Sequence, residues 1–336
     1  MGKATKQQRT QASGKALHGR KRALAVIGLL SASVVVILWF LLPVRNPFGQ
    51  FPSTTKAEAV LESLLRGKDE AIDLALANWL VAADVPQFSG LTREAYFSQL
   101  NEMVEVVRRE TARMEGVARS RGQNPNDPGT RCAIFCNAVL KLRFAYAEEF
   151  RQRDLTPGQR KALYGDANHI LLAGLLQTRR GTCVSMPLLY LVIGQRLGYP
   201  VHLVAIGSHY FIRWEEPGYR LNIETTSVEK VRVSEQDESY LETEGLTRDK
   251  IKGSELRNLT RREVVGQLLF ARSGHWMFRQ ETSPSRGWMD LSRARHLSPD
   301  DPAIKLAHEG IFSRYGIGPS DTLATLHKKE TQGPNP

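Results

Sequence analysis

Residues 180–224 read RGTCVSMPLLYLVIGQRLGYPVHLVAIGSHYFIRWEEPGYRLNIE, and their hydrophobic pattern changes from helical to strand-like. Val184–Leu197 is largely apolar and is followed by Gly198-Tyr199-Pro200, a combination typical of a helix end. Three segments with strand composition come next, separated by turn residues: Val201–Ile206, His209–Trp214 and Tyr219–Glu224. This stretch therefore predicts one helix followed by a small antiparallel sheet.

Outside this stretch, apolar residues recur every three or four positions, which predicts helices. Before it, the expected helices cover 57–65, 69–82, 92–114, 131–150 and 165–176. After a polar stretch at 225–258, they cover 261–278, 288–297 and 303–315. A mostly helical chain with one small antiparallel sheet has an α+β fold.

The N-terminal residues predict a membrane anchor. Residues 1–22 hold seven Lys and Arg and no acid, and Ala23–Leu42 is an uncharged run that would span about 30 Å as a helix. A cleaved signal peptide is the alternative, but its apolar stretch is usually shorter. The positive-inside rule then places residues 1–22 as a cytoplasmic tail before a transmembrane anchor (23–43). The segment after it is rich in Pro, Gly, Ser and Thr, which predicts a linker (44–56). Residues 44–336 would lie outside the cytoplasm, which in a bacterial inner membrane means the periplasm.

Composition excludes several classes of protein. The formal charge is +11, from 46 basic and 35 acidic residues, but without the tail 39 basic residues face 35 acidic ones. A nucleic-acid-binding domain would carry a basic face of its own apart from the tail, so no nucleic-acid partner is expected. Three cysteines exclude a disulfide-built scaffold, and the histidines show no ligand spacing, so we expect no metal or cofactor.

Cys183 is the candidate nucleophile. It directly precedes the predicted helix Val184–Leu197, where the helix dipole and unpaired N–H groups favour a thiolate and can bind an oxyanion. Gln177 and Asn168 are candidates for a second oxyanion donor. The alternative is that Cys183 is a small buried hydrophobe, as most free cysteines are. Cys132 and Cys136, one helical turn apart in an apolar segment, fit that alternative better, or could pair with each other.

His209 and Glu224 are the candidate partners of this thiol. If Glu215–Gly218 forms a four-residue turn, Trp214 pairs with Tyr219 and His209 lies directly opposite Glu224. Alternation then puts both on one face of the hairpin together with Asn222, and the opposite face is apolar enough to be the core side. A carboxylate that orients a histidine, which in turn activates a thiol, suits nucleophilic catalysis. The alternative is an ion pair that only stabilises the hairpin.

These residues resemble the transglutaminase-like superfamily. The features that carry the resemblance are Gly181-Thr182-Cys183, the helix end Gln195–Pro200, His209, and the acid in the next strand. The closest resemblance is to the bacterial SirB-type proteins, to which Asp73–Ala77, Tyr96–Asn101 and Asn168–Trp214 are also similar. It implies a papain-like core with Cys183 as nucleophile, His209 as base and Glu224 as third member, where the superfamily usually has Asp.

The domain organisation follows from this resemblance and from composition. We expect a SirB-like transglutaminase-like domain at 57–258, a helical extension at 259–325 and a flexible tail at 326–336. Glu263–Pro302 resembles one degenerate tetratricopeptide unit, and a plain helical extension is the alternative. A single unit cannot bury its own apolar face, so these helices should pack on the core or on a protein partner.

Two functions fit the sequence. The first is a membrane-anchored thiol enzyme outside the cytoplasm that transfers an acyl group from a protein or peptide substrate to water or to an amine. The second is a non-catalytic interaction module that binds protein or cell-wall peptide on the same fold.

Overall fold

The computed structural model describes residues 55–152, 155–207, 209–226, 232–234, 236–278 and 284–315. The predicted cytoplasmic tail, the anchor, nearly all of the linker and the C-terminal tail lie outside these residues. Among the helices that are described, none is both long and apolar enough to cross a membrane.

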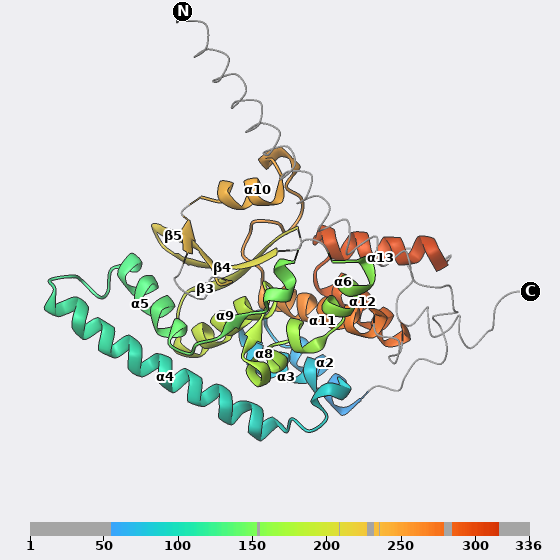
Figure 1. The fold of residues 1–336 in the computed structure, drawn as a ribbon, viewed down its shortest axis with the longest axis horizontal. Coiled ribbons are helices and arrows are strands. Elements are labelled where there is room, and N and C mark those ends of the chain that lie inside the picture. Colours follow the sequence, from blue (N-terminus) through green and yellow to red (C-terminus); the bar gives the residue numbers. More distant parts are fainter. Residues whose placement is uncertain are drawn as a thin grey trace, which may run out of the picture.

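Helices make up most of the described chain (Figure 1). They are α2 (Lys56–Leu65), α3 (Leu74–Ala83), α4 (Arg93–Ser120), α5 (Pro128–Leu140), α6 (Pro157–Tyr164), α7 (Ala167–Ile170), α8 (Leu172–Thr178), α9 (Ser185–Leu197), α10 (Glu238–Glu244), α11 (Arg261–Phe278), α12 (Pro284–Leu297) and α13 (Pro302–Tyr315). The helix predicted at 69–82 was wrong at its start, because the Asp73 carboxylate accepts from the amides of Ala75 and Leu76 and caps a helix that begins at Leu74.

The strands form two sheets. The larger is antiparallel in the order β3 (Val201–Ile206), β4 (His209–Glu216), β5 (Tyr219–Glu224) and β6 (Arg232–Ser234). The smaller is a parallel pair, β1 (Ala145–Tyr146) and β2 (Arg180–Gly181). The expectation of a single sheet was therefore wrong, as was a helix over 131–150, because α5 ends at Leu140 and the chain then turns into β1.

The register of the β4–β5 hairpin differs from the prediction by two residues. Glu216 pairs with Tyr219, so the turn contains only Pro217 and Gly218, with Gly218 at a φ of +78°. Glu216 extends β4 because its carboxylate binds Arg131 and accepts from the Trp214 indole, both at 2.9 Å. Residue 211 rather than 209 therefore aligns with Glu224, but a shift of two keeps every side chain on its predicted face.

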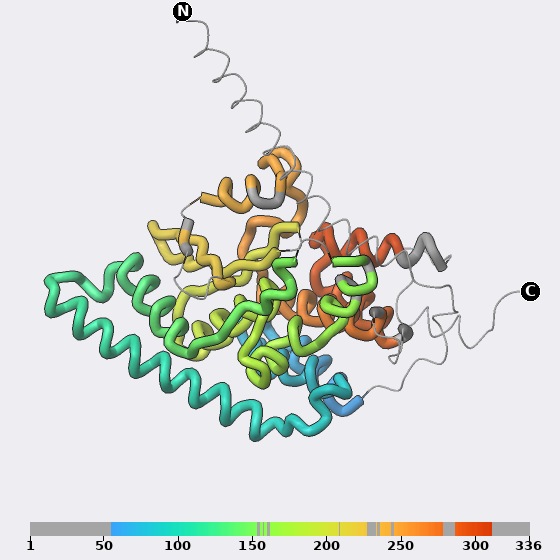
Figure 2. The backbone as a smooth tube through the Cα atoms, viewed as in Figure 1, coloured from blue at the N-terminus to red at the C-terminus, as the bar shows by residue number. Residues whose placement is uncertain are grey.

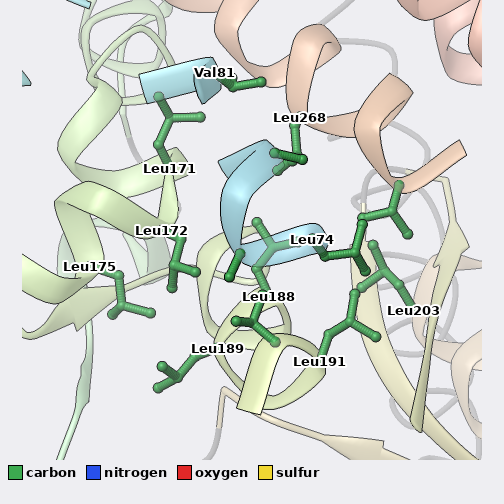
Figure 3. Close-up of a cluster of buried hydrophobic side chains, with 14 of the residues drawn as sticks. Leu74, Val81, Leu171, Leu172, Leu175, Leu188, Leu189, Leu191, Leu203 and Leu268 are labelled. Carbon is green, nitrogen blue, oxygen red and sulfur yellow. The ribbon is translucent and has the colours of Figure 1, made fainter. Parts of the chain in front are cut away.

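Helices cover both faces of the larger sheet. On one face, α9 joins the main core, whose centre is the leucine-rich cluster in Figure 3 contributed by α3, α8, α9, β3 and α11. On the other face, which carries His209, Tyr240 and Leu241 of α10 pack on Val204 and Phe211. The sequence did not predict this second cover, because α10 lies in the stretch that reads as merely polar.

A buried polar network holds α10 against the sheet. Arg213 is 1% exposed and Asn222 is fully buried, and both bind Oδ1 of Asp237, at 2.7 and 2.8 Å respectively. Arg213 also donates to Asn222 at 2.8 Å. Because each charge and amide in the network has partners, it can lie in the interior without a large desolvation penalty.

The C-terminal helices belong to the same core as the N-terminal ones, as the adjoining blue and orange tubes in Figure 2 show. Arg272 of α11 is 1% exposed and forms a two-bond ion pair with Asp290 of α12, both bonds at 2.7 Å. It also donates to the Val81 carbonyl at 2.9 Å and lies 3.8 Å from Glu58. The extension therefore packs on the core, which is one of the two outcomes expected for it.

Candidate active site

The start of α9 holds Cys183 in a fixed turn. The Thr182 carbonyl accepts from the Met186 amide at 3.0 Å, and the Thr182 hydroxyl accepts from the Val184 amide at 3.2 Å. The hydroxyls of Thr182 and Ser185 both donate to the carbonyl of His169, at 3.0 and 2.7 Å. Cys183 itself is half-buried, so its thiol lies on a rigid turn directly before the helix, as predicted.

His209 is the first residue of β4 and contacts the predicted partners. Its Nε2 lies 2.7 Å from Oε2 of Glu224, and the two side chains are 21% and 16% exposed. A carboxylate only accepts, so Nε2 carries the hydrogen of this bond. The other ring nitrogen, Nδ1, is left for the hydrogen bond that His209 makes with Cys183. The structure therefore brings all three predicted residues together.

Glu224 is held in place by the end of β5. Its Oε1 accepts from the Thr226 amide at 2.9 Å and from the Thr226 hydroxyl at 2.7 Å, while Oε2 faces His209. The carboxylate lies diagonally across the hairpin from His209 rather than directly opposite, because of the two-residue register shift. Long side chains reach such diagonal neighbours, so the contact survives the shift.

The electrostatics of the site favour a charged histidine. Burial alone would lower the pKa of His209, but its hydrogen bonds to Cys183 and Glu224, together with their negative charges, raise that pKa well above its usual value. Burial would raise the pKa of Glu224, yet its bonds to His209 and Thr226 lower it. A protonated imidazole between a thiolate and a carboxylate is suited to donate a proton to a leaving group.

Other candidate residues lie elsewhere. Asn222, which shares a face with His209, binds Arg213 and Asp237 instead. Among the described residues neither Gln177, exposed on α8, nor Asn168, at the start of α7, has a contact that joins it to Cys183. The proposed oxyanion roles of these two side chains therefore have no geometric support.

Cys132 and Cys136 form a different environment. Both are free, at most 1% exposed, and one turn apart within α5. The hydrogen bond that the Cys136 thiol donates to Cys132, together with burial, raises the pKa of Cys136 well above its usual value. The suggestion that they pair as a disulfide was wrong, and the alternative of a buried helix pair was correct.

Tyr146 and Arg151 are site residues that the sequence analysis missed. Tyr146 pairs in register with Gly181, two residues before Cys183, and the Arg151 guanidinium lies 4.8 Å above its ring. Tyr146 lies in the segment 131–150, which was expected to be helical, and Arg151 directly follows that segment. Across the part of the chain with assigned positions, no group of three or more His, Cys, Asp or Glu side chains is placed to hold a metal ion.

Comparison with known proteins identifies the family. A family model described as the transglutaminase-like superfamily matches residues 94–270, from the start of α4 into α11. The match covers more than half of the chain and includes Cys183, His209 and Glu224, so the protein belongs to the transglutaminase-like superfamily. No curated protein and no solved structure matches the chain. This membership is compatible with thiol acyl-transfer chemistry.

Proposed function

We propose that this protein is a thiol-dependent acyl-transfer enzyme with Cys183 as nucleophile, His209 as acid and base, and Glu224 as the residue that orients His209. The observation that carries this proposal is the position of His209, whose two ring nitrogens serve Glu224 at 2.7 Å and Cys183 at the start of α9. A hairpin ion pair with a purely structural role would not need a half-buried thiol at a helix start as its second partner.

The reaction follows the geometry in two steps. The Cys183 sulfur forms a bond to the carbonyl carbon of an amide or ester in a protein or peptide, and the carbonyl electron pair moves to oxygen. As that oxyanion collapses, the bond to the leaving group breaks, the proton on His209 goes to the leaving group, and a thioester remains. His209 then removes a proton from water or an amine, whose oxygen or nitrogen forms a bond to the thioester carbon. The carbon–sulfur bond breaks, Cys183 leaves as a thiolate, and the proton remains on His209. Water gives hydrolysis, and an amine gives a cross-link.

An acyl-electrophile probe tests this function. The wild-type protein should be labelled at Cys183, identified by peptide mapping, and labelling should be lost in Cys183→Ala and strongly reduced in His209→Gln. A wild-type protein that stays unlabelled, and whose Cys183 reacts with iodoacetamide no faster than a buried thiol, contradicts the proposal. That result would favour the alternative function, a non-catalytic module that binds protein or cell-wall peptide.

We further propose that residues 23–42 anchor the protein in the inner membrane of a bacterium, with the N-terminus in the cytoplasm and the enzymatic domain in the periplasm. The support is the charge asymmetry, seven cations before the apolar run against Arg45 and Lys56 closely after it. A reporter fused after Pro336 that is active only in the periplasm would agree. Activity of a cytoplasm-only reporter at the same position would refute this topology.

The relation to SirB-type proteins and to tetratricopeptide repeats is also a proposal. In the C-terminal extension, this proposal is supported by the close packing of α11 against α12. A side chain on Gly266 would come within 2.4 Å of the Ser298 hydroxyl, and one on Gly287 within 2.5 Å of Met277. A protein partner of these helices would meet Leu306 of α13, which is 49% exposed.

A further inference from the structure

Tyr146 lies beside the segment that leads into Cys183. It forms β1 with Ala145 and pairs in parallel with β2, so that Tyr146 aligns with Gly181. The backbone of this pair is fixed by bonds from the Ala145 amide to the Arg179 carbonyl at 2.9 Å and from the Ala147 amide to the Gly181 carbonyl at 2.8 Å. A two-residue sheet stabilises little by itself, so its position next to the nucleophile suggests a role in the site.

The Tyr146 side chain points toward the start of α9. Residues in register in neighbouring strands place their side chains on the same face of the sheet. On that face, a Cβ built on Gly181 would come within 2.7 Å of Leu175 and of Met186 and within 2.9 Å of the Ser185 hydroxyl. Ser185 and Met186 are the first two residues of α9, so Tyr146 and the first turn of α9 share one face.

Arg151 ties Tyr146 to the other side of the site. Its guanidinium lies over the Tyr146 ring and donates to the Thr226 carbonyl at 3.4 Å. Thr226 in turn holds the Glu224 carboxylate through its amide and hydroxyl. Tyr146 is therefore connected to the nucleophile through β2 and to the end of β5 through Arg151, and it lies between these two parts of the site.

The phenol of Tyr146 can donate a hydrogen bond to a bound substrate. Within the residues whose positions are assigned, its hydroxyl has no hydrogen-bond acceptor. Burial raises the pKa of Tyr146, and the negative charge of Cys183 raises it further, so the phenol keeps its proton at any working pH. A neutral hydrogen-bond donor near a reacting centre can stabilise an oxyanion.

We propose that the Tyr146 hydroxyl donates a hydrogen bond to the carbonyl oxygen of the substrate while Cys183 attacks it. This proposal rests on the proposed acyl-transfer function. During the attack the carbonyl electron pair moves to oxygen, and the phenol proton stays on Tyr146 and is shared with the oxyanion. The second donor is a backbone N–H group of the turn that leads into α9, other than the Val184 and Met186 amides, which bond to Thr182. When the oxyanion collapses, the phenol is left unchanged for the deacylation step.

Two reactions of the same thiol test this role. The first is acylation by p-nitrophenyl acetate, which passes through an oxyanion; the second is alkylation by iodoacetamide, which does not. In Tyr146→Phe, the rate of acylation should fall about 100-fold or more, as for loss of one oxyanion donor, while the rate of alkylation changes less than about threefold. Tyr199→Phe is the matched control, because Tyr199 packs on Phe135 and Trp214 at the opposite end of α9.

The outcomes separate this inference from the function on which it rests. Acylation of Tyr146→Phe at the wild-type rate refutes the role of Tyr146 and leaves acyl transfer intact. An equal loss in acylation and alkylation also refutes it, because Tyr146 would then act on the thiolate. A wild-type protein that is alkylated rapidly but never acylated refutes both proposals. Thermal melting of each variant distinguishes these results from loss of the fold.

Discussion

Two kinds of cysteine occur in this protein, and their surroundings give the same side chain opposite properties. Cys183 is half-buried at the start of α9 and contacts His209, whereas Cys132 and Cys136 are buried in the middle of α5 and contact each other. Cys183 lies at the positive end of a helix dipole and next to His209, whose pKa is raised. The others lie in an apolar interior that disfavours the thiolate. Position in the helix and access to solvent therefore decide which thiol is suited to react.

The largest expected effect is loss of the reactive thiol itself. Cys183→Ala should abolish labelling by an acyl probe, because both remaining cysteines are at most 1% exposed. Mass spectrometry of the labelled peptides measures this directly. Label on Cys132 or Cys136 in the wild-type protein would remove the distinction between the two environments.

Next in size is the effect of the carboxylate that holds His209. Glu224→Gln keeps the shape but neither holds the imidazole as firmly nor stabilises its charged form, and an analogous change in serine proteases costs about 10⁴-fold in turnover. Steady-state kinetics on the acyl substrate measure the loss. Glu216→Gln is the matched control, a half-buried glutamate on the same hairpin that binds Arg131 and Trp214. Equal losses of turnover in the two variants would show that Glu224 only stabilises the hairpin.

The two kinds of cysteine should also differ in stability. Cys136→Ser places a hydroxyl in a fully buried site and should cost about 1–3 kcal/mol of unfolding free energy. Cys183→Ser should change that free energy by less than about 1 kcal/mol, because the thiol is partly solvated and away from the packed core. Chemical denaturation compares the two. A larger loss for Cys183→Ser would mean that this thiol is part of the packing.

The smallest effect is the pH dependence that the His209–Glu224 pair adds to stability. The raised pKa of His209 means that its contribution is complete below the usual histidine value and is lost as pH rises through the raised one. The lowered pKa of Glu224 means that its contribution is complete above 4.5 and is lost as pH falls through the lowered one. The difference in unfolding free energy between wild type and Glu224→Gln should therefore be greatest between pH 4.5 and the usual pKa of histidine. A difference that grows steadily with rising pH would contradict this sign.

The sequence predicted the His209–Glu224 contact despite a wrong register. Glu215-Glu216-Pro217-Gly218 is compatible with a turn of four residues or of two, and local composition does not distinguish them. The protein forms the two-residue turn because Glu216 belongs to the strand, where it binds Arg131, 85 positions earlier in the chain. Because side chains alternate with a period of two, either turn places His209 and Glu224 on one face.

Two parts of the site could not be predicted from local pattern. Tyr146 lies in a strand of two residues, too short to show alternation, and its pairing with Gly181 depends on tertiary contacts. The α10 helix lies in a polar stretch, and its position depends on Asp237, which binds Arg213 and Asn222 from the sheet. In contrast, α9 and β3 were predictable because a long apolar helix, a glycine stop and a β-rich segment follow one another.

The buried Arg272 cluster has a consequence for how the chain is made. Arg272 lies 191 residues after Val81, whose carbonyl it binds, and it also faces Glu58 near the beginning of the domain and Asp290 near its end. During synthesis, α2 and α3 emerge long before the helices that cover them, and contacts of such long separation form late. The apolar faces of α2 and α3 therefore stay exposed until the helices that cover them have been synthesised. We expect the nascent chain to need shielding by a chaperone until α12 has been made.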